Sequence, residues 1–215
     1  MSSNQRWEDA QRVEQSHQYH SYVRSEEDAK NFVEKLNIDY NGLKEKNIIA
    51  IGSGSGRIHN LSVGNTKVGI DPLSDEIFDE NRQSNAELLT GVGESIPIRS
   101  NTFDIALNVN VLDHCKNPRQ VLSEIKRILK RGGKLLSNVN IFGTPNFVNK
   151  HLGKIDPPHP HHFNQQKICN MISESGFEIE YTDVDKHGPD QASHKLVIAM
   201  KVFKMRKINL VAIAE

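Results

Sequence analysis

A short apolar run that stops at three glycines sets the strongest limit on the fold of this chain. Residues 48–51 read Ile-Ile-Ala-Ile, and Gly52, Gly54 and Gly56 follow at intervals of two. A continuous apolar run bounded by glycine is typical of a buried strand in a parallel sheet. Glycine lacks a Cβ, so it reaches positive φ and allows a ligand to lie against the main chain. The run therefore predicts a buried parallel strand whose carboxyl end binds a ligand.

The spacing of the glycines separates two kinds of nucleotide site. A dinucleotide fingerprint reads G-x-G-x-x-G and needs a third glycine where this chain has Arg57. The G-x-G-x-G spacing instead resembles the first motif of class I S-adenosylmethionine-dependent methyltransferases. This resemblance makes Gly52, Ser53, Gly54 and Gly56 candidate cofactor contacts. A plain structural loop after a strand is the alternative for this motif taken alone.

A second short apolar strand ends in the carboxylate of Asp71. An acidic side chain at this place can accept hydrogen bonds from both ribose hydroxyls of a nucleoside. Asp71 follows Gly56 by only 15 positions, so the helix that we expect around residues 57–63 must be short. An Asp-Pro turn with Pro72 is the alternative interpretation of Asp71.

The most specific block runs from Glu94 to Gly133. It contains E-S-I-P-I, then F-D-I-A-L-N, then N-V-L-D-H, and ends in P-R-Q-V-L-S-E-I-K-R-I-L-K-R-G-G. This block closely resembles small-molecule methyltransferases of the type 11-like family, and the resemblance covers residues 47–140 with a looser echo beyond. The residues agree with a helix here, because Asn117 is a good N-cap and proline follows at the first helical position. We expect this helix to end at Gly132.

The resemblance implies a single Rossmann-like α/β domain. Its sheet would have seven mostly parallel strands, an antiparallel last strand and helices on both faces. Residues 1–45 would form an N-terminal helical cap, residues 46–140 the cofactor-binding core, and residues 141–215 a lid and the C-terminal part of the sheet. Apolar spacing favours a helix over a strand for residues 192–203, and a closing strand for residues 208–214.

The resemblance also implies S-adenosylmethionine as the cofactor, with one departure at the adenine site. Relatives place an acidic residue at the position of Val92. Here the backbone at Gly93 and Glu94 would hold adenine instead, with Leu73 packed on a ring face. The remaining expected cofactor contacts are Pro72, Ser95 and Asn108.

The segments on either side of the core are the expected acceptor site. The N-terminal segment closes over the cofactor in related enzymes, so Tyr19 and Tyr22 are candidates for its methionine end; a packing helix is the alternative. Ser25 begins a helix with an apolar stripe, and Asn164 caps another helix that ends at Gly176. Residues 141–163 form a long irregular stretch rich in glycine and proline, which predicts a lid.

Three histidines are candidate catalytic bases. If the acceptor is a hydroxyl, a base that titrates near neutral pH helps, and the unperturbed pKa of histidine is about 6.5. His114 lies just beyond the fourth predicted strand, and His161 and His162 lie on the predicted lid. His114 is equally suited to a structural role in its turn.

Neither a metal site nor DNA-methylating chemistry is expected from this sequence. His151, His159, His161 and His162 offer imidazoles, but no cysteine or carboxylate joins them at structural-zinc spacing. The segment Asp156-Pro-Pro-His159 is similar to the D-P-P-Y motif of amino-methylating DNA enzymes. It follows the fifth strand rather than the fourth, so we treat the match as coincidence.

Composition limits the partners. The chain has 215 residues, 36% of them hydrophobic, and its 27 basic residues balance its 27 acidic ones. Zero net charge argues against a nucleic-acid partner and leaves a small molecule as the expected acceptor. Two cysteines, no bilayer-spanning apolar stretch and no signal peptide predict a cytoplasmic protein away from membranes. A non-catalytic cofactor-binding or partner-binding protein, and less so a nicotinamide-dependent oxidoreductase, remain alternatives, and the sequence leaves the oligomeric state open.

Overall fold

The computed structural model describes residues 25–54, 56–77, 84–144, 160–185 and 203–215. The helices are α2 (Glu26–Lys35), α3 (Ser74–Ile77), α4 (Pro118–Ile128) and α6 (Gln165–Glu174), with two 3-10 turns, η1 (Asn41–Leu43) and η2 (Arg57–Asn60). The strands are β1 (Asn47–Ile51), β2 (Thr66–Asp71), β3 (Glu87–Thr90), β4 (Phe103–Val109), β5 (Leu129–Ile141), β6 (Phe177–Val184) and β7 (Arg206–Ala214).

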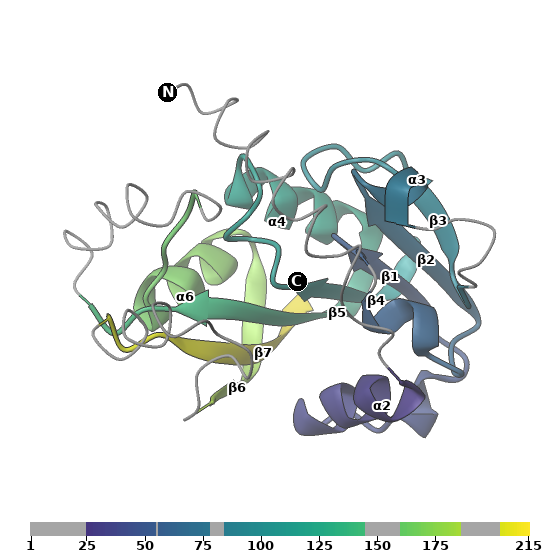
Figure 1. The fold of residues 1–215 in the computed structure, drawn as a ribbon, viewed down its shortest axis with the longest axis horizontal. Coiled ribbons are helices and arrows are strands. Elements are labelled where there is room, and N and C mark those ends of the chain that lie inside the picture. Colours follow the sequence, from purple (N-terminus) through teal and green to yellow (C-terminus); the bar gives the residue numbers. More distant parts are fainter. Residues whose placement is uncertain (1–24, 55, 78–83, 145–159, 186–202) are drawn as a thin grey trace.

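The strands form a single sheet in the order β3-β2-β1-β4-β5-β7-β6 (Figure 1). Neighbours from β3 to β5 are parallel, and β7 runs antiparallel to both β5 and β6. This confirms the predicted seven-stranded, mostly parallel sheet with an antiparallel closing strand. The chain order reverses between β1 and β4, and ligands of open α/β sheets bind beyond the carboxyl ends of the strands at such a point.

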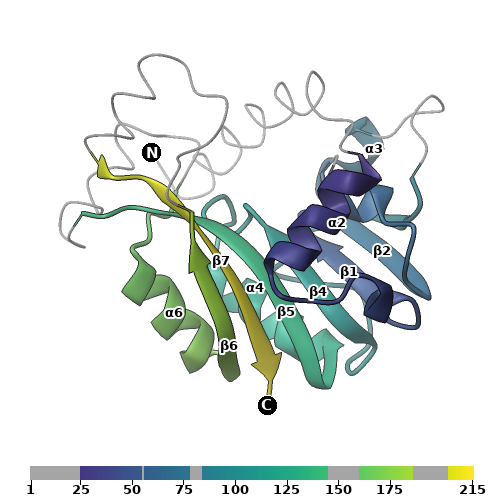
Figure 2. The ribbon, with the colours of Figure 1, turned by 90° about the horizontal axis from the view of Figure 1, so that it is seen from below.

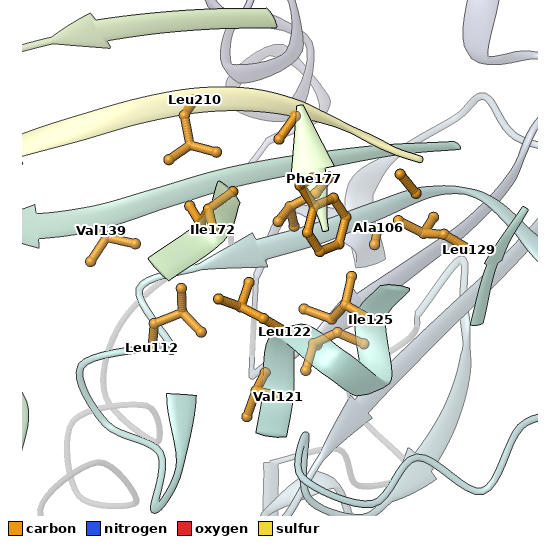
Figure 3. Packing of buried hydrophobic residues seen from close by; sticks show 14 of the residues in the cluster. Ala106, Leu112, Val121, Leu122, Ile125, Leu129, Val139, Ile172, Phe177 and Leu210 are labelled. Carbon is orange, nitrogen blue, oxygen red and sulfur yellow. The ribbon is translucent and has the colours of Figure 1, made fainter. Parts of the chain in front are cut away.

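Helices cover both faces of the sheet, as predicted (Figure 2). The apolar side chains of α4 and α6 share one buried cluster, and those of α2 and η2 share the other. Figure 3 shows the first cluster, in which Leu122 and Ile125 of α4 point toward Ala106 of β4 and Phe177 of β6. The sheet is therefore buried on both sides, and polar groups at its carboxyl edge lie beside an apolar interior.

Three helices begin where the sequence predicts. Ser25 Oγ accepts a hydrogen bond from Asp28 N at 3.1 Å, and the Asp28 carboxylate accepts one from Ser25 N, which forms a capping box. The Asn117 side chain caps α4 by accepting a hydrogen bond from Gln120 N, and the Asn164 side chain caps α6 by accepting one from Lys167 N. Each cap satisfies backbone N–H groups that the first turn of a helix leaves unpaired.

The predicted end of α4 at Gly132 is wrong. The helix ends at Ile128, and Gly132, with φ 75°, already lies in β5. The register between β4 and β5 shifts at this point. A Cβ on Gly133 would lie 2.8 Å from the carbonyl oxygen of Lys130 and 3.2 Å from that of Asp104. The two glycines therefore permit an irregularity in the strand and do not cap the helix.

One strand was not predicted from local patterns, and two predictions are not tested. β3 has no distinct apolar pattern, and its residues are half-buried or exposed at the edge of the sheet. The predicted helix over residues 192–203 and most of the predicted lid over residues 141–163 fall outside the described residues.

Candidate functional site

The glycine loop after β1 requires glycine for two different reasons. Gly52 and Gly54 have φ values of 63° and 44°, which side-chain-bearing residues rarely adopt. A Cβ on Gly52 would lie 2.4 Å from Cγ2 of Val111, and a Cβ on Gly56 would lie 2.6 Å from the carbonyl oxygen of Ser53. The loop therefore bends back on itself and lies against the turn that follows β4.

Asp71 joins the end of β2 to this loop. Its carboxylate accepts a hydrogen bond from Gly54 N at 2.8 Å and another from Leu73 N at 2.9 Å. The bond to Leu73 N is the turn that we weighed as the alternative role of Asp71, with Pro72 at its centre. The bond to Gly54 N is additional and brings the carboxylate to the glycine loop. The predicted contact with a ribose stays a prediction.

His59 is the residue that sequence reasoning missed. It lies in η2, is buried, and places Nε2 2.7 Å from the carbonyl oxygen of Gly54 and Nδ1 2.7 Å from Oγ of Ser84. A carbonyl oxygen only accepts, so Nε2 carries the proton. Burial lowers the pKa of His59 to about 4, against the opposing effect of the Gly54 and Ser53 carbonyls. His59 is thus neutral near pH 7 and stabilises the glycine loop through its hydrogen bond to the Gly54 carbonyl.

We call Gly54, His59 and Asp71 the loop cluster. No sequence motif predicts that His59 binds the glycine loop. This role depends on the burial of His59 and on its contact with Ser84, not on its spacing from the glycines.

The predicted adenine-binding block lies beside the start of α4. Oε1 of Glu94 accepts hydrogen bonds from the backbone N–H groups of Lys116 and Asn117 at 2.7 and 3.0 Å. A Cβ on Gly93 would lie 2.9 Å from the side chain of Ile51, so this block packs against the end of β1. The Glu94 side chain is therefore engaged with α4. Backbone binding of adenine at Gly93 and Glu94, near Leu73, Val92 and Ser95, stays a prediction.

Asn108 is fully buried near the end of β4, and its amide is unusual. Neither its Oδ1 nor its Nδ2 has a hydrogen-bond partner among the described residues. Ser137, its neighbour in β5, also has an unpartnered, buried hydroxyl. A buried polar group without a partner costs about 1–3 kcal/mol of stability, and such groups in native proteins call for a functional or structural explanation.

A second polar cluster links the turn after β4 to β5. Nδ2 of Asn140 donates to Oδ1 of Asn110 at 2.7 Å and to Oδ2 of Asp113 at 3.1 Å. Nδ2 of Asn110 lies 3.1 Å from Nε2 of His114. An amide nitrogen only donates, so His114 Nε2 accepts and its proton is on Nδ1. We call Asn110, Asp113, His114 and Asn140 the Asn110 cluster.

The backbone of Asn110 is itself strained. Its φ of 59° lies in the left-handed region, which asparagine tolerates better than most residues. Non-glycine residues in this conformation gather at functional sites.

His161 is brought to the turn that carries His114, and His162 packs against Phe142. His161 N donates to the carbonyl oxygen of Asp113 at 3.2 Å, and His161 Nε2 donates to that of Cys115 at 3.0 Å. Burial lowers the pKa of His161, against the opposing effect of the carbonyls of Lys116 and Cys115. His162 is buried with its ring centroid 5.0 Å from that of Phe142. Their catalytic roles stay predictions.

Four of the candidate residues named in the sequence analysis lie outside the described part of the chain. Tyr19 and Tyr22 lie outside the described residues, as do His151 and His159. Within the described ranges, no group of three or more His, Cys, Asp or Glu residues is placed to hold a metal ion. Among these same residues, no helix is long and apolar enough to cross a bilayer.

Comparison with known proteins finds similarity to methyltransferases over the middle of the chain. Residues 49–137 match the methyltransferase domain family. A probable S-adenosylmethionine-dependent methyltransferase of Mycolicibacterium smegmatis is 29% identical over 96 residues, which cover 43% of this chain and 35% of that protein. An uncharacterised protein of Methanocaldococcus jannaschii is 32% identical over 102 residues, or 47% of each chain. The match thus spans less than half the length of either relative.

Solved structures share the fold. The phosphoethanolamine N-methyltransferase 2 of Haemonchus contortus, in complex with S-adenosylhomocysteine, superposes with a TM-score of 0.65 at 15% identity, over 87% of this chain and 52% of that one. The chain therefore shares the Rossmann-like α/β fold of this methyltransferase structure. Over residues 49–137 the chain is thus similar to the methyltransferase domain family, and part of this region is similar to a probable S-adenosylmethionine-dependent methyltransferase.

Proposed function

We propose that this protein transfers the methyl group of S-adenosylmethionine to an oxygen or nitrogen atom of a small-molecule acceptor. One observation carries the proposal: the glycine loop after β1 and the carboxylate at the end of β2 meet through the hydrogen bond from Gly54 N to Asp71. This meeting occurs inside the segment that matches the methyltransferase domain family.

The residues present fit the cofactor. Each Asp71 carboxylate oxygen accepts one backbone hydrogen bond, from Gly54 N or from Leu73 N. These two bonds hold the carboxylate at the glycine loop, and a carboxylate is a suitable acceptor for ribose hydroxyls. Gly52 and Gly56 have no Cβ, which keeps the main chain of the loop approachable. These features support Asp71 as the ribose ligand and the loop as the support for the methionine end.

The bound cofactor supplies a methyl group on a sulfonium, which an acceptor displaces in line. The chain's own residues then have to bind the acceptor, orient it and exclude water. His161 suits a role as general base, because its Nε2 proton is committed to the carbonyl of Cys115 and burial lowers its pKa. That leaves Nδ1 as the basic nitrogen at neutral pH. His114 and His162 are the other two candidates.

Titration tests the cofactor proposal. We expect the full chain to bind S-adenosylmethionine and S-adenosylhomocysteine, and Asp71→Ala to weaken binding by roughly 1–3 kcal/mol, the usual effect of removing hydrogen bonds to a charged group. Calorimetric titration of both nucleosides and of NAD provides the measurement. Saturable binding of NAD alone would overturn the proposal, and an unchanged affinity in Asp71→Ala would restrict that carboxylate to its turn.

Turnover tests the catalytic proposal. The protein is incubated with cofactor and panels of small alcohols and amines, and mass spectrometry follows the gain of one methyl group. His114→Ala, His161→Ala and His162→Ala are assayed singly for turnover and, separately, for cofactor affinity. We expect at least one to lose turnover while its cofactor affinity is kept. Full turnover in all three would exclude histidine base catalysis, and cofactor binding without turnover on any acceptor would favour a non-catalytic protein.

A further inference from the structure

The Asn110 cluster contains two buried oxygen atoms that accept no hydrogen bond from the part of the chain that the structure describes. Asp113 and Asn140 are 2% and 5% exposed. Oδ1 of Asp113 and Oδ1 of Asn140 have no hydrogen-bond partner among the described residues. Their other polar atoms are bonded to each other, since Asn140 Nδ2 donates to Asp113 Oδ2. The hydrogen bonds within the cluster therefore satisfy Asn140 Nδ2 and Asp113 Oδ2, and the two Oδ1 atoms still lack donors among the described residues.

The nearest histidine does not supply the missing donor. Nε2 of His114 is 4.0 Å from Asp113 Oδ1, too far for a hydrogen bond. It also accepts a hydrogen bond from Asn110 Nδ2, so it has no proton to direct at the carboxylate. A buried carboxylate oxygen without a donor is unfavourable, and a bound cation with N–H groups relieves this.

The position of the cluster agrees with an acceptor site. On one side, the side chain of Val111, next to Asn110, occupies the space that a Cβ on Gly52 would need. On the other side, His161 N donates to the carbonyl oxygen of Asp113. The cluster therefore lies between the glycine loop and the segment that follows the predicted lid. The strained φ of Asn110 marks the same turn.

We propose that Asp113 Oδ1 and Asn140 Oδ1 bind the protonated amino group of the acceptor, so that the substrate is a small primary amine. This inference rests on the proposed function and names its substrate class. An ammonium group has three N–H donors and a positive charge, which match two accepting oxygens and one carboxylate. An alcohol has one donor for two acceptors. A carboxylate or phosphate at this place would be repelled by Asp113.

Matched probes test this on the wild-type protein. Butylammonium, 1-butanol and butyrate share a carbon chain and differ in the head group. In the presence of saturating S-adenosylhomocysteine, ligand-observed NMR should show butylammonium binding about tenfold or more tightly than 1-butanol, and no binding of butyrate. Equal or undetectable binding of amine and alcohol would overturn the inference.

Variants locate the binding group. Asp113→Asn keeps the shape of the side chain and removes the charge, so it should lower butylammonium affinity about tenfold toward that of 1-butanol. Asp183→Asn, which removes a carboxylate from the edge strand β6, should leave all three probes unaffected. Unchanged amine binding in Asp113→Asn would also overturn the inference.

Measuring the affinity for S-adenosylhomocysteine distinguishes a failure of the proposed function from a failure of the amine inference alone. Unchanged binding of S-adenosylhomocysteine in Asp113→Asn would show that the variant is folded and that the amine effect is local. If S-adenosylhomocysteine fails to bind the wild-type protein, the proposed function and this inference both fail. If it binds while amine and alcohol are not distinguished, only the amine inference fails.

Discussion

The loop cluster and the Asn110 cluster lie near the same edge of the sheet, yet they are built differently. In the loop cluster, Asp71 and His59 bond to the main chain of Gly54, and both Asp71 oxygens accept backbone hydrogen bonds. In the Asn110 cluster, side chains bond mainly to one another and leave Asp113 Oδ1 and Asn140 Oδ1 without a partner among the described residues.

The loop cluster fixes the shape of the glycine loop, whereas the Asn110 cluster is suited to binding a ligand. Side-chain bonds to a loop's own backbone hold that loop in one shape before any ligand binds, which reduces the entropy lost on binding. Acceptor oxygens left without donors gain stability when a bound molecule supplies N–H or O–H groups. Perturbing the loop cluster should therefore reduce stability and cofactor affinity. Replacing an unpartnered polar group should instead stabilise the fold.

The largest expected effect comes from Gly52→Val. The branched side chain needs a φ of 63° and meets Val111 Cγ2 2.4 Å from its Cβ. Backbone strain and overpacking each cost roughly 1–3 kcal/mol, so we expect S-adenosylhomocysteine affinity to fall about 100-fold or more. Gly132→Val is the matched control, because its φ of 75° is similarly strained but its Cβ would meet nothing within 4 Å. Equal cofactor affinities in the two variants would contradict a preset loop.

The pH dependence of unfolding tests His59. Burial holds its folded pKa at about 4, below the ordinary value of 6.5. As pH falls, the unfolded chain takes up this proton first, so the stability contributed by neutral His59 is complete above about pH 6.5 and is lost as pH falls through about 4. The difference corresponds to about 3 kcal/mol.

The matched variant is His59→Gln, which keeps an amide N–H for the Gly54 carbonyl and does not titrate. Urea unfolding at about pH 7 and about pH 4 measures the free energy of both proteins. The wild type should lose about 3 kcal/mol more than the variant over this interval. Parallel losses would show that His59 does not hold the loop as a neutral donor.

Asn108→Leu tests the other side of the comparison. Removing a fully buried amide with no partner among the described residues should raise the free energy of unfolding by roughly 1–2 kcal/mol. Asn138→Leu is the control, because Asn138 Nδ2 donates to Asn209 Oδ1 at 2.5 Å and its loss should be destabilising. A concurrent loss of cofactor affinity in Asn108→Leu would support the predicted cofactor contact. Destabilisation by Asn108→Leu would break the contrast between the two regions.

Glu94→Gln should have the smallest effect. Glutamine keeps an oxygen for the N–H groups of Lys116 and Asn117 and loses only the charge beside the start of α4. We expect a loss of less than about 1 kcal/mol, reduced further by added salt. Glu174→Gln, at an exposed ion pair with Arg119, should show no loss. A loss above about 2 kcal/mol would mean that Glu94 supports more than the helix start.

Local sequence was sufficient for features that involve neighbours along the chain. The helix starts at Ser25, Asn117 and Asn164 were predictable, because a cap bonds to N–H groups two or three residues away. The positive φ of Gly52 and Gly54 was predictable for the same reason, since the absence of a Cβ is a property of the residue itself. The alternation of apolar strands and helices then favoured a parallel α/β sheet, and the resemblance to a known family completed its seven strands.

Tertiary structure alone decided the features that depend on distant segments. The end of α4 moved to Ile128 because the chain from Leu129 onward pairs with β4, where Gly133 passes close to the Asp104 carbonyl. His59 became part of the site only through its burial against Ser84. Asn140 meets Asn110 from 30 positions away. No local spacing specifies such pairs, because packing of the sheet and its helices selects which polar groups meet and which oxygens are left for a ligand.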